Sequence, residues 1–505
     1  MNASNKILKF VSLILIISVW MIMPSNVSSK SSDPERNKVL IIGLDGADWK
    51  VMDPLLEGGE LPNLKSLIKE GRRSDLESSI PSMSPVAWTT FATGKNPGKH
   101  GVFSFLRKEG DEFIPLTSED VKSKSLWDIT SRENLSSIVI NVPMTYPPHE
   151  VKGKMISGYL SIDNTTYTYP ESLQKEIENR GYKIEALSDG FEPGKENEFL
   201  KDLNYTVEKR TETAKSLLKE NNWNLSVVVY TGLDRLQHYF WKYMDEKDSK
   251  YENVIPDHYE KLDKEVGELL EIIDNDTKII VLSDHGFGEL RGEVYLNHWL
   301  KKEGYLEMKK SESFLGRLGI SQQGLVSFLK DLGIFEPVKW IFEQIGIYDA
   351  GKNLPRPRME DIDMKNTKAF AANFGGGIYI TAENYKEVKE EIKQKIRDLK
   401  NPETGEMLFT EIKDKSEVYN GEMFGKAPDL IVDSPKWDPV GFLGYGKLYS
   451  KNIDKSGKHR NTGILITNFE VREGEKSLHD VAPTVLDLLS VERDEDMDGD
   501  SLLER

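Results

Sequence analysis

Cysteine is absent from this 505-residue chain. Its absence excludes disulfide bonds, thiolate nucleophiles and metal sites built from thiolates. Basic residues are also few, because 67 Lys and Arg stand against 84 Asp and Glu and give a formal net charge of −17. That balance argues against non-specific nucleic-acid binding, which needs basic surface. The candidate metal ligands considered below are therefore Asp and His side chains.

One apolar run, at the N-terminus, indicates a compartment. Lys6 and Lys9 precede Phe10–Met23, and small residues follow that could be cleaved. This order is typical of a secretory signal, and the run is short for a membrane span, which needs about 20 apolar residues. We therefore interpret residues 1–29 as a signal peptide or an N-terminal membrane anchor and 30–37 as a linker. The protein is expected to be extracytoplasmic, either secreted or membrane-anchored.

Short β-branched apolar runs alternate with helical patterns from residue 38 onward. Strands that are apolar on both faces and alternate with helices predict a mostly parallel sheet covered on both sides. The fold class is therefore α/β with a doubly wound sheet, in which sites collect at the carboxyl ends of strands. The predicted strands are Val39–Leu44, Ile138–Ile140, Ser226–Tyr230, Lys278–Leu282, Leu430–Val432 and Gly463–Ile466, and the predicted helices are Leu61–Gly71, Lys201–Asn221, His258–Ile273, Lys386–Leu399 and His479–Leu489.

A stretch at about 306–360 interrupts this alternation. Between Phe314 and Ile345 it repeats large apolar residues at helical spacing, which predicts a helical insertion in a domain that otherwise runs over 38–505. Such an insertion forms a small satellite core, or else it serves as a lid over the site or as a surface that touches lipid.

Ser84 stands where another helix is predicted to begin. Serine is a preferred N-cap, Pro85 suits the first helical position, and Gly94 can end the helix. The N-terminus of a helix favours negative charge, and that suits a nucleophile attacking a phosphate. A simple helix cap is the commoner use of such a serine, and this segment alone does not decide between the two.

Carboxylates and imidazoles lie close to the ends of several predicted strands. Asp234 and His238 are four residues apart, which places them on one face of a helical turn and suits a shared metal. Each of these residues taken alone has an ordinary alternative, such as a turn cap, a helical ion pair or a surface histidine. The full set is Asp45, Asp234, His238, Asp284, His285 and His459.

Together with Ser84, these six side chains would serve two divalent cations about 3.5–4 Å apart. One cation would activate the Ser84 oxygen, and the other would hold a phosphate oxygen and stabilise the leaving group. A mixed Asp and His ligand set favours Zn2+, with Mn2+ as the alternative and Ca2+ less suited.

The same residues, in this order, resemble the alkaline phosphatase superfamily. The resemblance runs from about Lys38 to Leu502 and is closest to the type I phosphodiesterase/nucleotide pyrophosphatase family, in its phosphohydrolase- and phosphomutase-like branch. It implies an alkaline-phosphatase-like fold and a metal-dependent phosphoric ester hydrolase. The segments that carry it are Ile41–Gly46, Ser84–Trp88, Thr93–Gly101, Asp234–His238, Ser283–Gly286 and Gly457–Arg460.

The resemblance also implies a role for each residue. Asp45, Ser84, Asp284 and His285 match the ligands of one metal, and Asp234, His238 and His459 match those of the other. Ser84 takes the place of the nucleophile, which many diesterase relatives fill with threonine. The implied reaction is in-line attack on phosphorus, a covalent phospho-serine and then hydrolysis. The implied substrate is a phosphodiester or phosphomonoester of a small molecule or lipid.

Two departures and two alternatives accompany this resemblance. Nucleotide pyrophosphatases usually carry an asparagine shortly after the His100-Gly101 turn, where it contacts a phosphate oxygen, whereas this chain has Phe105. The residues that follow Ser84 do not match sulfatases.

A membrane-associated transferase of phospho-groups such as phosphoethanolamine would use the same site. A degenerate protein that only binds metal is the second alternative.

Overall fold

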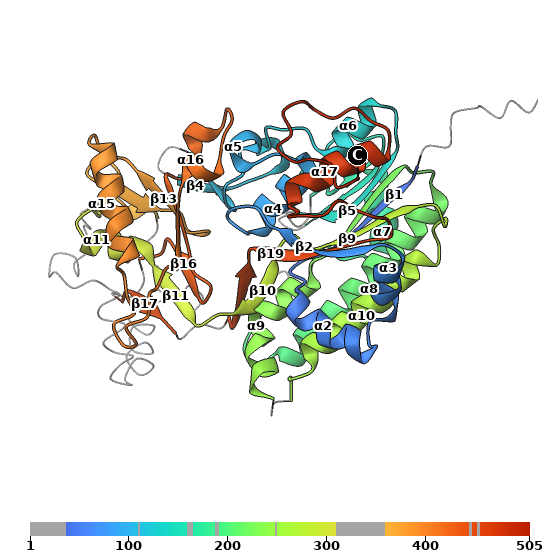
Figure 1. Ribbon diagram of the computed structural model, residues 1–505, viewed down its shortest axis with the longest axis horizontal. Coiled ribbons are helices and arrows are strands. Elements are labelled where there is room, and N and C mark those ends of the chain that lie inside the picture. The colour runs from blue at the N-terminus through green and yellow to red at the C-terminus, as the bar shows by residue number, and fades with distance from the viewer. Residues whose placement is uncertain are drawn as a thin grey trace, which may run out of the picture. The chain divides into compact units, whose positions relative to one another are not determined.

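The computed structural model describes most of the chain beyond residue 36 (Figure 1). The described ranges are 37–109, 112–158, 165–186, 191–247, 250–309, 359–443, 447–451 and 455–504. The N-terminal segment 1–29, the linker up to residue 36 and the apolar stretch from Phe314 to Ile345 lie outside them. Within those ranges, no helix is long and apolar enough to cross a membrane.

A mixed sheet of eight strands, in the order β2-β19-β9-β1-β8-β5-β6-β7, organises the main core. The five strands from β9 to β6 run parallel, while β2, β19 and β7 pair antiparallel at the two edges. β1, β5 and β8 are buried along their whole length, as their continuous apolar runs predict. The strands are β1 Val39–Leu44, β2 Arg72–Glu77, β5 Ser137–Val142, β6 Gly153–Ser157, β7 Thr168–Tyr169, β8 Leu225–Tyr230, β9 Lys278–Leu282 and β19 Thr462–Thr467.

Helices cover both faces of this sheet (Figure 1). Alternate residues of β1 point to opposite sides, so Leu40 and Ile42 join the core under α2, α3, α8, α9 and α10, while Val39 and Ile41 join the core under α4, α6 and α17. The α/β prediction is confirmed. The helices are α2 Trp49–Gly58, α3 Pro62–Glu70, α4 Ser84–Thr93, α5 Pro97–His100, α6 Leu126–Arg132, α7 Ser172–Asn179, α8 Glu196–Glu220, α9 Gly232–Glu246, α10 Val254–Leu270 and α17 Val481–Leu488.

A second, smaller core lies between β9 and β19 in the chain. It contains a four-stranded sheet, β12-β13-β15-β14, and a three-stranded sheet, β16-β11-β17. The strand predicted at 430–432 pairs with β13 and β14 in the four-stranded antiparallel sheet and not with the main one, because Leu430 and Val432 pack in the second core. The elements are β11 Gly292–Tyr295, α11 Leu296–Lys302, β12 Ala369–Ala371, β13 Gly377–Ile380, α15 Tyr385–Arg397, β14 Glu411–Asp414, α16 Lys415–Val418, β15 Leu430–Asp433, β16 Trp437–Val440 and β17 Tyr449–Ser450.

Two short antiparallel ribbons complete the fold. In the first, β10 (Gly286–Glu289) pairs with β18 (Gly457–Arg460), with Phe287 opposite His459. This ribbon brings the end of β9 next to a segment about 170 residues further along the chain. The second ribbon joins β3 to β4. The remaining elements are β3 Leu106–Glu109, β4 Glu112–Pro115, η1 Ser118–Asp120, η2 Met359–Asp361, η3 Phe424–Lys426 and η4 Leu478–Asp480.

Candidate functional site

The residues predicted to carry chemistry meet at the carboxyl ends of the parallel strands. Asp45 directly follows β1, Asp234 lies in the first turn of α9 just after β8, and Asp284 follows β9. His285 leads into β10, and His459 reaches the same place from β18, which pairs with β10. This edge of a doubly wound sheet is where ligands generally bind.

The first group consists of Asp45, Asp284 and His285, all of which are buried. The Nε2 atom of His285 lies 3.3 Å from Oδ2 of Asp284 and 3.6 Å from Oδ1 of Asp45. These two carboxylate oxygens receive no hydrogen bond from any described residue. The other oxygen of each carboxylate is held, by the indole N–H of Trp88 at 3.0 Å for Asp45 and by the amide of Gly46 at 3.3 Å for Asp284.

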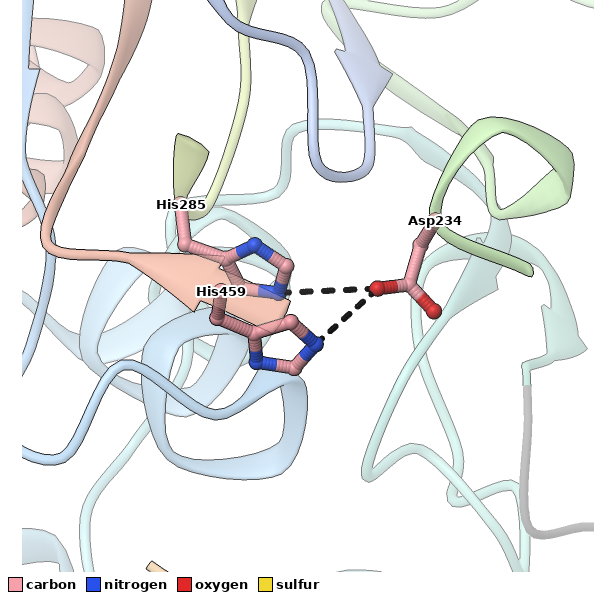
Figure 2. Close-up of side chains that lie close together, drawn as sticks. All are labelled: Asp234, His285 and His459. Carbon is pink, nitrogen blue, oxygen red and sulfur yellow. Dashed lines mark hydrogen bonds and ion pairs between the residues drawn. The ribbon is translucent and has the colours of Figure 1, made fainter. Parts of the chain in front are cut away.

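The second group consists of Asp234, His238 and His459. Oδ1 of Asp234 lies 3.0 Å from Nε2 of His459 and 3.5 Å from Nε2 of His238, and the two Nε2 atoms are 3.1 Å apart. Figure 2 shows that the same Asp234 oxygen faces His285 as well, at 4.0 Å. Asp234, His285 and His459 lie close enough together to form a candidate metal-binding set. His285 is therefore shared, and the two groups are adjacent.

Backbone carbonyl groups hold the imidazole rings of His238, His285 and His459 on the side away from the site. Each Nδ1–H donates to a carbonyl oxygen, so each Nε2 presents its lone pair to the site, as is usual for metal-binding histidines. The Nε2 atoms of His238 and His459 therefore face each other as two acceptors, and a cation between them would satisfy both. The distances are 2.9 Å from His238 to Gly457, 2.8 Å from His459 to Ser82 and 3.1 Å from His285 to Gly286.

The electrostatics of the site also fit bound cations. Burial, with the charges of Asp284 and Asp234, raises the pKa of Asp45. Burial and the charge of Asp234 raise the pKa of Asp284 to about 8. Burial lowers the pKa of His238, and it lowers the pKa of His285 to about 3, so both imidazoles stay neutral and keep the Nε2 lone pair available to a metal. Ligands about 2.0–2.1 Å from a tetrahedral Zn2+ lie roughly 3.3 Å apart, close to the donor separations found here. The two Asp/His clusters are thus consistent with a binuclear metal site.

Ser84 opens α4 and points its hydroxyl at this site. Its Oγ lies 3.4 Å from Nε2 of His285, and the residue is 7% exposed. The cap prediction is off by one residue, because Met83 adopts the extended N-cap conformation and Ser84 is the first helical residue. The Ser84 side chain makes no capping hydrogen bond, and Gly94 ends the helix in the left-handed conformation, as predicted.

His100 lies away from the cluster, in α5. It is buried, its Nε2 lies 3.1 Å from Oγ1 of Thr90, and its Nδ1 accepts the amide of Val102 at 3.2 Å. These contacts give His100 a structural role in the turn that ends at Gly101.

Trp88 is a supporting residue to which sequence reasoning gave no role. It lies one turn after Ser84 on α4, so one buried helix presents the hydroxyl and also holds Asp45. The indole packs over Gly43, where an added Cβ would lie 2.3 Å from the ring. The sequence does contain the small residue Gly43 and the indole of Trp88. Their contact could not be predicted, because it joins segments about 45 residues apart.

We expect Trp88→Phe to weaken metal binding about 10- to 100-fold, because Asp45 loses the donor that orients its carboxylate. Titration of the metal-free protein with Zn2+ measures this. Trp127→Phe is the matched control, since Trp127 lies in the same core and its indole nitrogen has no hydrogen-bond partner among the described residues. Equal losses in both variants would reduce the role of Trp88 to packing.

A cavity of about 380 Å³ opens in front of Ser84 and the second group of side chains. One wall comes from the segment that precedes α4 and from α9, and the opposite wall comes from the second core. The cavity is lined by residues that include Ile80, Met83, Phe105, Arg235, Tyr239, Phe374, Lys413, Ile431, Val432, Asp433, Pro439 and Lys458.

Comparison with known proteins agrees with this architecture. Residues 39–459 match the family described as Type I phosphodiesterase / nucleotide pyrophosphatase. Phosphonoacetate hydrolase from Sinorhizobium meliloti is similar in complexes with phosphonoformate and with phosphonoacetate; each has a TM-score of 0.57, with 13% and 12% identity, and each match covers 90% of this chain and 96% of that one. Human ectonucleotide pyrophosphatase/phosphodiesterase 5 matches over the same shares, with a TM-score of 0.49 and 14% identity. No curated protein sequence matches. The likeness to phosphonoacetate hydrolase confirms the alkaline-phosphatase-like fold.

Proposed function

The chain belongs to the type I phosphodiesterase/nucleotide pyrophosphatase family of phosphoric ester hydrolases, and from that premise we propose that it cleaves phosphate esters through Ser84 with two divalent cations. The observation that carries the proposal is the convergence of five Asp and His side chains in two adjoining candidate metal sets, with His238 beside them, next to a serine hydroxyl at a helix N-terminus. Asp45, Asp284 and His285 would hold one cation, which Ser84 would also approach. Three further residues would hold the other cation, namely Asp234, His238 and His459.

Bound cations would draw electron density from the phosphate and favour the ionised serine oxygen. The mixed oxygen and nitrogen ligands support Zn2+ first and Mn2+ second. The N-terminus of α4 adds a positive field where the phosphate oxygens would lie. Because α4 is buried along its whole length, this field is weakly screened by solvent.

The proposed reaction has two displacements at phosphorus. In the first, Ser84 loses its proton, Oγ forms a bond to phosphorus, and the bond from phosphorus to the ester oxygen breaks, so that an alcohol leaves. In the second, water attacks the phospho-serine and the bond to Oγ breaks, which regenerates Ser84 and releases the phosphate. A small phosphorus oxyanion compound is the kind of substrate that we propose, since phosphonoacetate hydrolase of similar fold is described with phosphonoacetate bound.

The direct test is the hydrolysis of bis-p-nitrophenyl phosphate and p-nitrophenyl phosphate by the metal-free protein, before and after Zn2+ or Mn2+ is added. We expect negligible hydrolysis without metal, and restored hydrolysis with about two metal ions bound per chain. Less than one bound metal per chain under metal-replete conditions would contradict the proposal. Two bound metals without hydrolysis would instead favour transfer of a phospho-group to another acceptor.

A further inference from the structure

Beyond the Asp and His ligands, the cavity has an aromatic wall. Phe374 is 36% exposed, although it is a large apolar residue, and its ring lies against Phe105 with centroids 5.8 Å apart at 76°. Phe442 packs against Phe374 from another side, at 5.6 Å and 88°. Phe105 stands where nucleotide pyrophosphatases usually carry an asparagine. In this chain it instead packs with Phe374 to form an apolar part of the cavity lining.

The turn that presents Phe374 is fitted against the segment that leads to Ser84. Gly375 and Gly376 have φ values of +81° and +67°, which side chains rarely adopt. A Cβ on Gly375 would lie 2.6 Å from Sδ of Met83, the residue that precedes Ser84. A Cβ on Gly376 would lie 2.0 Å from the carbonyl oxygen of Val432. The exposed ring is thus held close to Ser84 by a close-packed turn.

Most of the Lys and Arg side chains that line the cavity are paired with carboxylates. Of the four Lys and Arg residues in the lining, three already contact a carboxylate. The pairs are Lys458 with Asp433 at 3.0 Å, Arg235 with Glu185 at 3.6 Å and Lys413 with Glu411 at 3.6 Å. Lys458 also donates to two backbone carbonyls and is 6% exposed. A polyanionic group would have to break such pairs, whereas an uncharged apolar group would not.

Building on the proposed hydrolysis, we propose that the substrate is a phosphoric diester whose second ester group is a short, uncharged apolar chain or ring seated on Phe105 and Phe374. Removing this group from water favours binding in proportion to its apolar area. Because the ring of Phe374 is already exposed in the cavity, it needs no rearrangement to receive the group.

The test is a series of p-nitrophenyl alkyl phosphates, from methyl to pentyl, which share one leaving group. With the metal-loaded protein, we expect kcat/KM to rise by up to about fourfold per methylene, mostly through KM. A chain of the same length that ends in a carboxylate is expected to lose this gain. Phe374→Ala should flatten the series, so that its loss in kcat/KM relative to the wild type grows with each added methylene. Tyr205→Ala is the matched control, since Tyr205 is a 39% exposed aromatic residue on α8 that does not line the cavity.

The outcomes separate this inference from the proposed function. Hydrolysis of the series with no dependence on chain length, or with the same dependence in Phe374→Ala, would overturn the inference and leave the proposed function intact. Failure to hydrolyse any ester would contradict the proposed function. In that case, the affinities of methyl- to pentylphosphonate for the metal-loaded protein still test the inference: tighter binding with length in the wild type but not in Phe374→Ala supports it, and equal affinities overturn it.

Discussion

Ser84→Ala is expected to lower kcat for bis-p-nitrophenyl phosphate by at least about 1,000-fold, because the variant lacks the oxygen that would attack phosphorus. The substitution removes only one oxygen atom, so we expect little change in the folding of α4. The Ser84 side chain makes no capping hydrogen bond, and Met83 keeps its own N-cap position. The six carboxylate and imidazole side chains proposed as ligands remain, so the variant should still bind close to two metal ions per chain.

Ser84→Thr provides the matched comparison, because it keeps a hydroxyl at the same position. We expect it to retain activity within about tenfold of the wild type if its oxygen takes the place of the serine oxygen. Metal content and the midpoint of thermal unfolding should be measured for both variants. An alanine variant with wild-type kcat would remove Ser84 from the role of nucleophile, whatever its effect on KM.

The parts of the fold that could be predicted from the sequence are those set by short-range patterns. The predicted bounds of β1 and β9 match the structure, because each strand is a short apolar run rich in β-branched residues and almost entirely buried. Asp45 and Asp284 follow these strands directly, so their convergence follows from parallel pairing. Helix ends were less well predicted: α10 begins at Val254 where His258 was expected, since Pro256 is typical of a break in a helix but is tolerated in its first turn.

The features that could not be predicted depend on contacts between distant segments. The second core is one, because an apolar run such as Leu430–Asp433 does not say which sheet it will join. The hydrogen bond from Trp88 to Asp45 and the contact between Gly375 and Met83 are others. Motifs predicted the chemistry of the site, whereas the part of the cavity lining that comes from the second core was revealed only by the structure.

Asp284→Asn is expected to have the second large effect, and it acts on metal binding. The variant removes one charge from the group that contains Asp45 and His285, so we expect bound metal to fall to about one ion per chain or less. We also expect kcat for bis-p-nitrophenyl phosphate to fall at least about 1,000-fold, because the cation next to Ser84 is lost. Metal analysis after gel filtration and steady-state kinetics with excess Zn2+ measure the two effects.

The same substitution should make the variant at least as stable as the wild type without metal, and less stable than the wild type with metal bound. Without metal, an amide at position 284 can keep the hydrogen bond from Gly46 and donate its own N–H to Nε2 of His285, where the carboxylate oxygen lies 3.3 Å away without a donor. The metal-free variant should therefore unfold at the same temperature as the metal-free wild type or at a higher one. Metal at 100 times its dissociation constant stabilises the wild type by about 2.7 kcal/mol per site, a gain that the variant largely loses.

Asp263→Asn is the matched control for this inversion. Asp263 is also buried, but its carboxylate accepts hydrogen bonds from the amide of Leu64 and from the amide and side chain of Asn63. Replacing it should destabilise the protein by about 1–3 kcal/mol whether or not metal is present, because an amide group would then face those donors. Parallel destabilisation in both variants would mean that Asp284 is a structural carboxylate. Inversion in Asp284→Asn alone would show that the protein keeps a carboxylate that costs stability without metal, as a metal ligand does.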